Sequence, residues 1–421
     1  MKRIELTIKA LSPLAIGQRK PGGSVSEALD YIPGTVIRGA IAKEILRHSD
    51  TEPTAGDDFH KLFLDKTAAI FGNAYPAIAQ IQPDKYRLST DPVQVIPASA
   101  LSTKTSSGFK PVKAGVFDSL IDSFCAKEQG HFYVPNDLEG DLVDAFTGFY
   151  SKSKQGYVSH KVSKRLLTRV GINRKRATAQ DEILYSIEVM NESQGKHEPQ
   201  NGKERVQTVY RSSILAQDTT EFANNLWEFL QQNCTHLRLG GSASRGLGKV
   251  RLISAKPVDE TDNPIKNRVE AFNKTLKKRW DMWSVLGDGA ESPTEKRSFF
   301  SITLHADAIL SENWRRTMVI SPAMLAPLIG LSANDIYSHM VYSGYDYRSG
   351  WNAAWGLPKD TELMTKMGGV MMFSIPKDWQ NECYKDLANL ERVGIGSRCS
   401  EGYGQLKVCD EFHQIMREAA V

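Results

Sequence analysis

The chain has 421 residues, 41% hydrophobic and 24% charged, which is the composition of a globular protein long enough for two or three domains. Its formal net charge is only +4, so any site for a polyanion must come from local clustering of charge. The 5 cysteines are scattered without a CxxC pair, which argues against a structural zinc site and for a reducing compartment. No apolar run approaches a membrane span, and residues 4–8 already alternate like a strand, so a cytoplasmic protein without a membrane partner is expected.

The first helix follows a basic loop and a tight turn. The loop contains Arg19 and Lys20 among several glycines, and the turn is Tyr31-Ile32-Pro33-Gly34. Thr35 suits the N-cap of the helix that follows. Arg38 then lies in the first helical turn, where N–H groups and the helix dipole attract anions.

The most basic segment of the chain is His160 to Arg176, which has no acidic residue. It predicts one strand of a hairpin with its tip at 174–180, whereas residues 84–115 before it lack a period and predict a long insertion loop. A charge run is usually a solvated surface. This run is long, carries one sign and is flanked by strands, so we interpret it as a polyanion-binding segment. Its candidate contact residues are Arg165, Arg169, Arg174, Lys175 and Arg176.

A glycine-rich stretch at 239–250 follows a predicted helix at 218–232 and contains Arg245 and Lys249. Glycine adopts positive φ readily, and exposed N–H groups beside two cations could cradle a phosphate chain. The pattern returns at 396–406, again after a predicted helix and before a strand. The repeat predicts two copies of one structural unit. The corresponding glycines are 156 residues apart: Gly240 and Gly396, Gly246 and Gly402, Gly248 and Gly404.

Glycines mark turns more often than ligand sites, but the repeated spacing and the basic residues favour binding. A dinucleotide fingerprint is excluded, because that motif opens a helix and both loops precede strands. Between the two halves, residues 257–264 form a polar break and residues 267–283 predict a basic amphipathic helix. Residues 299–304 then predict the first strand of the second half and residues 371–375 a buried strand.

The segment Tyr31 to Gly39 and the two glycine loops resemble the RAMP superfamily of CRISPR-associated RNA-binding proteins. Gly350-Trp351-Asn352 followed by Gly356-Leu357-Pro358 is similar to the large two-unit RAMP subunit of type III-D effector complexes. The resemblance implies an α+β fold of two tandem ferredoxin-like units. Its implied divisions are a first unit at 1–256 with insertions at about 84–115 and 150–205, a linker with the basic helix at 257–297, and a second unit at 298–421.

The resemblance further implies a non-catalytic subunit that grips the guide RNA near its 5′ handle in antiviral defence. Its partners would be the CRISPR guide RNA, other RAMP backbone subunits, the large polymerase-like subunit and, indirectly, target RNA. No cofactor is expected, and no metal, because Ser102 to Lys104 lacks the paired cysteines that some relatives carry in this insertion. The resemblance implies RNA contacts at Arg38, Arg245, Lys249 and Arg398, with loops shaped by Gly240, Gly241, Gly246, Gly248, Gly396, Gly402 and Gly404. Further candidate RNA-contacting residues are Arg19, Lys20, Ser242 and Tyr403.

A catalytic role has weaker support in the sequence. Residues 1–47 contain no histidine, and neither His48 nor His60 has an evident partner. Asp30 lies roughly where backbone RAMP subunits carry an aspartate that cuts target RNA, but it could equally cap the turn or pair with Arg38. The alternatives are therefore a metal-dependent endoribonuclease acting through Asp30 and a stand-alone RNA-binding protein.

The aromatic cluster from Tyr342 to Trp355 has two interpretations. It could stack on bases, or it could form a hydrophobic seam against another subunit. Because Arg348 is one of few cations in this segment, the seam is favoured.

Overall fold

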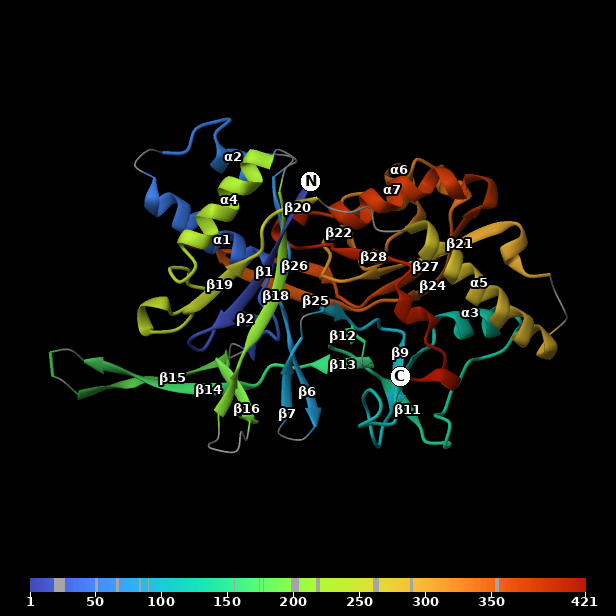
Figure 1. The fold of residues 1–421 in the computed structure, drawn as a ribbon, viewed down its shortest axis with the longest axis horizontal. Helices are drawn as coiled ribbons and strands as arrows, with labels where there is room; N and C mark the ends of the chain where they lie inside the picture. The colour runs from blue at the N-terminus through green and yellow to red at the C-terminus, as the bar shows by residue number, and fades with distance from the viewer. Residues whose placement is uncertain are drawn as a thin grey trace.

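The computed structural model describes residues 1–18, 27–49, 52–65, 68–82, 85–89, 91–154, 156–173, 175–176, 178–197, 204–216, 220–259, 265–287, 291–352 and 356–421. The fold is mixed α and β, with several antiparallel sheets. Two main sheets lie side by side, α1 and α4 accompany the first, and α6 and α7 accompany the second (Figure 1). Among the described residues, no helix is both long and apolar enough to cross a membrane.

The first main sheet has the strand order β19-β1-β18-β4. Its strands are β1 (Lys2–Ala10), β4 (Ile70–Phe71), β18 (Val209–Ala216) and β19 (Val250–Ser254), and its helices are α1 (Gly34–His48) and α4 (Thr220–Gln232). The predicted alternation in β1 is confirmed, because Ile4, Leu6 and Ile8 are buried in one core with the apolar stripes of both helices. The N-cap prediction was wrong: α1 begins after Pro33, and its first N–H, on Gly34, donates to Asn73 Oδ1 at 2.8 Å.

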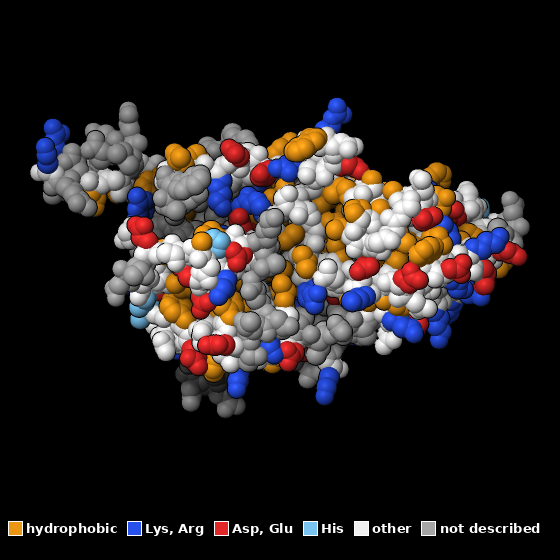
Figure 2. Space-filling model, turned by 90° about the horizontal axis from the view of Figure 1, so that it is seen from above, with side chains coloured by type: hydrophobic (Ala, Val, Ile, Leu, Met, Phe, Trp, Pro, Cys, Tyr) orange, Lys and Arg blue, Asp and Glu red, His pale blue; other side chains and the backbone are white. Residues whose placement is uncertain are grey.

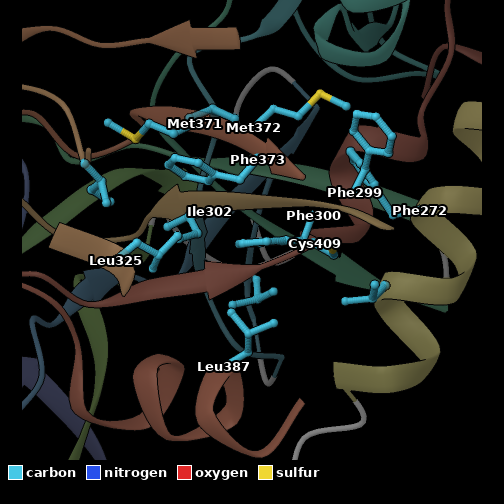
Figure 3. Packing of buried hydrophobic residues seen from close by; sticks show 14 of the residues in the cluster. Phe272, Phe299, Phe300, Ile302, Leu325, Met371, Met372, Phe373, Leu387 and Cys409 are labelled. Carbon is cyan, nitrogen blue, oxygen red and sulfur yellow. The ribbon is translucent and has the colours of Figure 1, made fainter. Parts of the chain in front are cut away.

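The second main sheet has the order β24-β27-β21-β28. Its strands are β21 (Arg297–Leu304), β24 (Tyr337–Tyr342), β27 (Val370–Pro376) and β28 (Leu406–Val408), and its helices are α6 (Pro322–Ile329) and α7 (Gln380–Val393). The central strands β21 and β27 are buried on both faces, as expected for a near-continuous apolar run. Figure 3 shows Phe299, Phe300 and Phe373 from these strands packed with Leu387 of α7 and Phe272 of α5 (Ile265–Trp283). The predicted amphipathic helix therefore buries its apolar face in the second core.

The prediction of a long loop at 84–115 was wrong. This segment contains β7 (Lys85–Leu88), β8 (Gln94–Val95) and β9 (Ala100–Thr103), which pair with other strands within residues 78–153. Strands of two to four residues are too short to show a period, so their pairing partners decide the conformation. The helix that follows, α3 (Leu120–Glu128), packs into the second core, where the rings of Phe124 and Phe299 lie 5.4 Å apart.

The predicted basic hairpin is confirmed as β14 (Lys164–Asn173) paired with β15 (Thr178–Met190). It projects from the end of the molecule opposite α3 and α5 (Figure 1). The remaining helices and strands of the described residues are α2 (Asp58–Phe63), β2 (Gly17–Gln18), β3 (Glu27–Ala28), β5 (Tyr75–Pro76), β6 (Ile78–Gln82), β10 (Val116–Asp118), β11 (Val143–Ala145), β12 (Phe149–Ser153), β13 (Gly156–His160), β16 (Ser193–His197), β17 (Glu204–Gln207), β20 (Val258–Asp259), β22 (Leu310–Glu312), β23 (Arg315–Thr317), β25 (Tyr345–Asn352) and β26 (Leu357–Thr365).

Candidate nucleic-acid interface

The two glycine loops have the same backbone conformation. Each is a single 3₁₀ turn flanked by two residues in the left-handed region. In the first loop these residues are Ser242 (φ 57°) and Gly246 (φ 85°), and in the second they are Arg398 (φ 62°) and Gly402 (φ 90°). The repeated glycine spacing is therefore a repeated turn. Non-glycine residues rarely adopt this region, which explains the glycines at its end.

The first glycine of each loop allows a close approach of two backbones. A Cβ at Gly240 would lie 2.5 Å from the carbonyl oxygen of Ala15, and a Cβ at Gly396 would lie 2.5 Å from that of Ile309. Beside these contacts, the Gly241 N–H donates to Ala15 O at 2.8 Å. Both loops are thus held against the segment that follows the first strand of their own half.

Three of the N–H groups in the first loop, where the sequence predicts a phosphate cradle, are engaged within the protein. The Arg245 N–H donates to a carbonyl within the loop at 2.9 Å, and the Gly246 N–H does the same at 3.2 Å. The Gly248 N–H donates to Pro13 O at 2.9 Å. These three amides are already satisfied within the protein, and the cations that the turn offers to a ligand are the exposed Arg245 and Lys249.

The first loop is exposed to solvent and contacts the basic hairpin. Arg245 Nη1 donates to the Tyr185 hydroxyl of β15 at 2.6 Å, and its guanidinium carbon lies 5.6 Å from the centre of that ring. From β14, Arg169 Nη2 lies 3.5 Å from the carbonyl oxygen of Arg245. A Cβ at Gly246 would meet nothing within 4 Å. The structure therefore joins two segments that are far apart in sequence into one basic surface.

The other basic residues of the hairpin differ in their surroundings. Arg165 is paired within the protein, since its Nη2 lies 3.1 Å from a carboxylate oxygen of Glu192. Lys175 and Arg176 are exposed at the hairpin tip. Arg174 lies outside the described residues. The basic hairpin therefore has two separate groups of cations. Arg169 contacts the first glycine loop at the base of the hairpin, and Lys175 and Arg176 lie at its tip.

Arg38 lies near the second glycine loop, where the charges of Glu401 and Arg398 act on its guanidinium. Its guanidinium donates to the carbonyl oxygen of Phe63 and lies 5.5 Å from the centre of the Phe63 ring. Burial lowers the pKa of Arg38. This arginine therefore holds α2 against α1. Arg19 and Lys20 lie outside the described residues.

The end of the second glycine loop is buried against the first half of the chain. A Cβ at Gly402 would lie 2.7 Å from the backbone oxygen of Phe71 and 2.9 Å from Asn73 Oδ1. Gly402, Tyr403 and Gly404 are all buried. The two loops therefore have the same backbone conformation but different environments. The first faces solvent, and the second packs between the two halves of the chain.

The cation of the second loop is neutralised inside the protein. Arg398 Nη2 lies 2.7 Å from Glu401 Oε2, and Lys359 Nζ lies 3.4 Å from the same oxygen. Burial alone would raise the pKa of Glu401, but the hydrogen bond and charge of Arg398 lower it below the usual range. The guanidinium of Arg398 also covers the Tyr403 ring at 5.1 Å.

A buried ion pair of the second half, beside this loop, meets the first half at Tyr31. The Tyr31 hydroxyl donates to Asp307 Oδ2 at 3.1 Å, and Arg348 Nη2 lies 2.8 Å from the same oxygen. Burial raises the pKa of Tyr31 well above its usual value. Arg348 therefore ties β25 to Asp307, and its guanidinium carbon lies 5.5 Å from the centre of the Tyr31 ring. Tyr345 and Tyr347 of the aromatic cluster remain exposed.

The catalytic alternative has little geometric support at Asp30. Its side chain is 63% exposed and forms an ion pair with Lys164 Nζ at 2.8 Å. The sequence left open a structural ion pair with Arg38, and the structure shows such a pair with Lys164 instead. A second arrangement looks like a hydrolase triad: His413 lies 3.1 Å from Asp118 Oδ2 and 2.8 Å from Thr303 Oγ1. All three side chains are buried, so this group cannot reach a substrate and serves the core.

Sequence reasoning missed one cluster of possible metal ligands, formed by Glu44, His48 and His236. The available signal was the spacing of Glu44 and His48, because residues four apart share one face of a helix. His236 comes from a loop distant in sequence, and only the fold brings it to α1.

Charge on the helix-bearing side is mixed. Figure 2 shows acidic and basic side chains interspersed with hydrophobic ones across this view, without a continuous field of one sign. A polyanion gains most from a surface of one sign, which makes the first loop and the hairpin base the stronger candidate.

The model of the RAMP superfamily matches residues 7–251. No curated protein matches. Two solved cryo-EM structures of the Type III-B Cmr-beta bound to cognate target RNA are similar: one, with AMPPnP, at 11% identity over 87% of this chain and 86% of the matched chain, and the other at 12% over 90% and 88%, both with a TM-score of 0.38. The apo state of Cmr-beta matches at 14% identity over 60% of this chain and 97% of that chain, with a TM-score of 0.28.

The assignment to a family rests on the superfamily match. That match includes the Tyr31 turn, α1, the basic hairpin and, of the first sheet, the end of β1, all of β4 and β18 and the start of β19. Because it extends over more than half of the chain, the protein belongs to the RAMP superfamily.

Proposed function

We propose that the chain is a non-catalytic RNA-binding subunit of a type III CRISPR effector ribonucleoprotein, built from two ferredoxin-like units at 1–256 and 298–421. The order of strands supports the architecture. In a ferredoxin-like βαββαβ unit the strands lie in the order 4-1-3-2, and β19-β1-β18-β4 and β28-β21-β27-β24 both follow it. A helix lies between the first two and between the last two of these strands in each half.

The observation that carries the RNA-binding role is the joining of the first glycine loop to the basic hairpin. Arg245 and Lys249 are exposed on a turn whose shape is fixed by glycines, and Arg169 meets the same turn from the hairpin. Side chains of this kind bind phosphates and set the position of the nucleic acid without reading its sequence. That is the chemistry a subunit needs if it holds guides of every sequence by their backbone.

The place within the complex is proposed from the sequence resemblance. The Gly350 motif lies at the tip of the β25–β26 hairpin, where Trp351 and Pro358 are paired. Together with the Tyr31 turn it supports a type III-D subunit near the 5′ handle of the guide, beside other RAMP subunits and the large polymerase-like subunit. The exposed Tyr345 and Tyr347 suit a seam with one of these neighbours, because tyrosine is enriched at protein interfaces.

The experiment compares two double variants that remove the same charge. Arg245→Ala with Lys249→Ala changes the first loop, and Lys274→Ala with Lys278→Ala changes exposed lysines of α5 at the opposite end of the molecule. The probe is a guide RNA with a repeat-derived 5′ tag, titrated at several salt concentrations. Each lost phosphate contact lowers the salt slope by about 0.7 for single-stranded RNA, so the loop variant should lose roughly 1.4. Equal slopes for both variants would refute the placement.

A further inference from the structure

Three ligand-type side chains meet where α1 ends. Glu44 and His48 lie one turn apart on α1, and His236 belongs to the loop between α4 and the first glycine loop. Their ligand atoms all lie within 4.8 Å of one another, and the Nδ1 atoms of both histidines are 3.8 Å from Glu44 Oε1. The helices α1 and α4 are neighbours (Figure 1), with the His48 ring 6.1 Å from that of Phe229 in α4.

The carboxylate of this cluster is buried with an unsatisfied oxygen. Glu44 is only 6% exposed, and its Oε1 has no hydrogen-bond partner among the described residues. Arg47 Nη1 approaches it to 3.6 Å, but that side chain is 69% exposed and the distance exceeds a hydrogen bond. Burying a carboxylate oxygen without a close partner is costly, so the site is built to receive a cation at this oxygen.

Both histidines are already oriented by a second contact. His48 Nδ1 lies 2.9 Å from the backbone oxygen of Glu44, and His236 Nδ1 lies 3.2 Å from Asn233 Oδ1. Because both Nδ1 atoms also face Glu44 Oε1, an ion at this oxygen takes the Nδ1 lone pairs in place of these two contacts, and the proton of each neutral ring then lies on Nε2. The rings are about half exposed, at 48% and 54%, so they can turn to close around an ion.

We propose that Glu44, His48 and His236 bind one divalent transition-metal ion, with Zn²⁺ as the best match. Two imidazoles and one carboxylate form a ligand set that suits Zn²⁺, and a tetrahedral ion then keeps one position for water. The ion replaces Arg47 as the counter-charge of the buried carboxylate. The sequence predicted no metal because the cysteine pattern was absent and each histidine seemed isolated.

The position of the ion gives it a structural consequence. It ties the last turn of α1 to the segment that leads directly into the first glycine loop, at Leu237 and Leu239. The other end of α1 begins at Gly34, which packs against Phe71 and the second loop. Bound metal therefore stabilises the folded chain by mass action and holds one side of the proposed RNA surface.

The test uses the purified full chain, stripped with a chelator and titrated with ZnCl₂ in a calorimeter. One equivalent should bind and raise the melting temperature. His236→Asn should weaken Zn²⁺ binding by more than about tenfold, because losing even a residue that only hydrogen-bonds to a metal ligand typically lowers metal affinity roughly 10- to 100-fold. His131→Asn, a change at another exposed histidine, should leave binding unchanged. Arg47→Ala should tighten binding, because it removes the competing cation.

Two results would overturn the proposal. Unchanged affinity in His236→Asn and Glu44→Gln would show that the ion binds elsewhere. Loss of binding in Cys234→Ser, with His236→Asn unaffected, would assign the ion to the half-buried thiol beside the loop. Because His236 and Arg47 are exposed side chains, their variants report on binding without threatening the fold.

Discussion

The two glycine loops allow a matched test of packing, because Gly246 and Gly402 occupy equivalent positions in two turns of the same type and have nearly the same φ. Alanine at either position incurs the left-handed strain of roughly 1–2 kcal/mol. At Gly246 the new Cβ meets nothing within 4 Å, whereas at Gly402 it lies 2.7 Å from the Phe71 backbone oxygen and 2.9 Å from Asn73 Oδ1. Overpacking of this kind costs about 1–3 kcal/mol more, so Gly402→Ala should lose about 2–5 kcal/mol in total.

Urea unfolding of both variants provides the assay, with the shift in midpoint converted by the slope of the wild-type chain. Their strain cancels in the difference, which therefore measures the clash between the second loop and the first half. RNA binding should show the reverse order, with Gly246→Ala the more affected, because its loop is exposed. Equal losses of stability would show that the second loop does not pack as described.

Three further predictions follow from single side chains. Tyr31→Phe removes a buried hydrogen bond to the Asp307 carboxylate and should cost about 1–3 kcal/mol in urea unfolding; an unchanged midpoint would contradict the link between the halves. Burial lowers the pKa of His160 to about 4, so the unfolded chain binds a proton between pH 6.5 and 4 that the folded chain excludes. Stability should therefore fall by up to about 3 kcal/mol as the pH drops through this range, and His160→Gln should flatten that fall; parallel profiles would argue against it. Asp30→Ala should leave target-RNA cleavage by the assembled complex unchanged, and loss of one product with assembly intact would make Asp30 catalytic.

The regular elements could be predicted wherever the sequence is periodic. The strand at residues 4–8, the amphipathic helix α5 and the basic hairpin were all visible as apolar or charged patterns. The strands within 84–115 could not be predicted, because each is only two to four residues long and its conformation is set by partners distant in the chain.

The candidate site shows the same limit at the level of side chains. The glycine spacing predicted two equivalent loops, and their backbones are equivalent. What the spacing could not show is that one loop faces solvent and the other meets Phe71, since this depends on how the two halves pack. Likewise, the joining of Arg245 to Tyr185, and of His236 to Glu44, needs contacts between elements that no local pattern encodes.

The central proposal is that the chain holds CRISPR guide RNA, and the RNA bound to it in cells tests this most directly. A tagged chain would be isolated from its native host, and the co-purifying RNA would be sequenced. We predict short RNAs that share one repeat-derived 5′ tag and carry many different guide sequences. Fragments of ribosomal RNA without such a tag would contradict the proposal and favour a stand-alone RNA-binding protein.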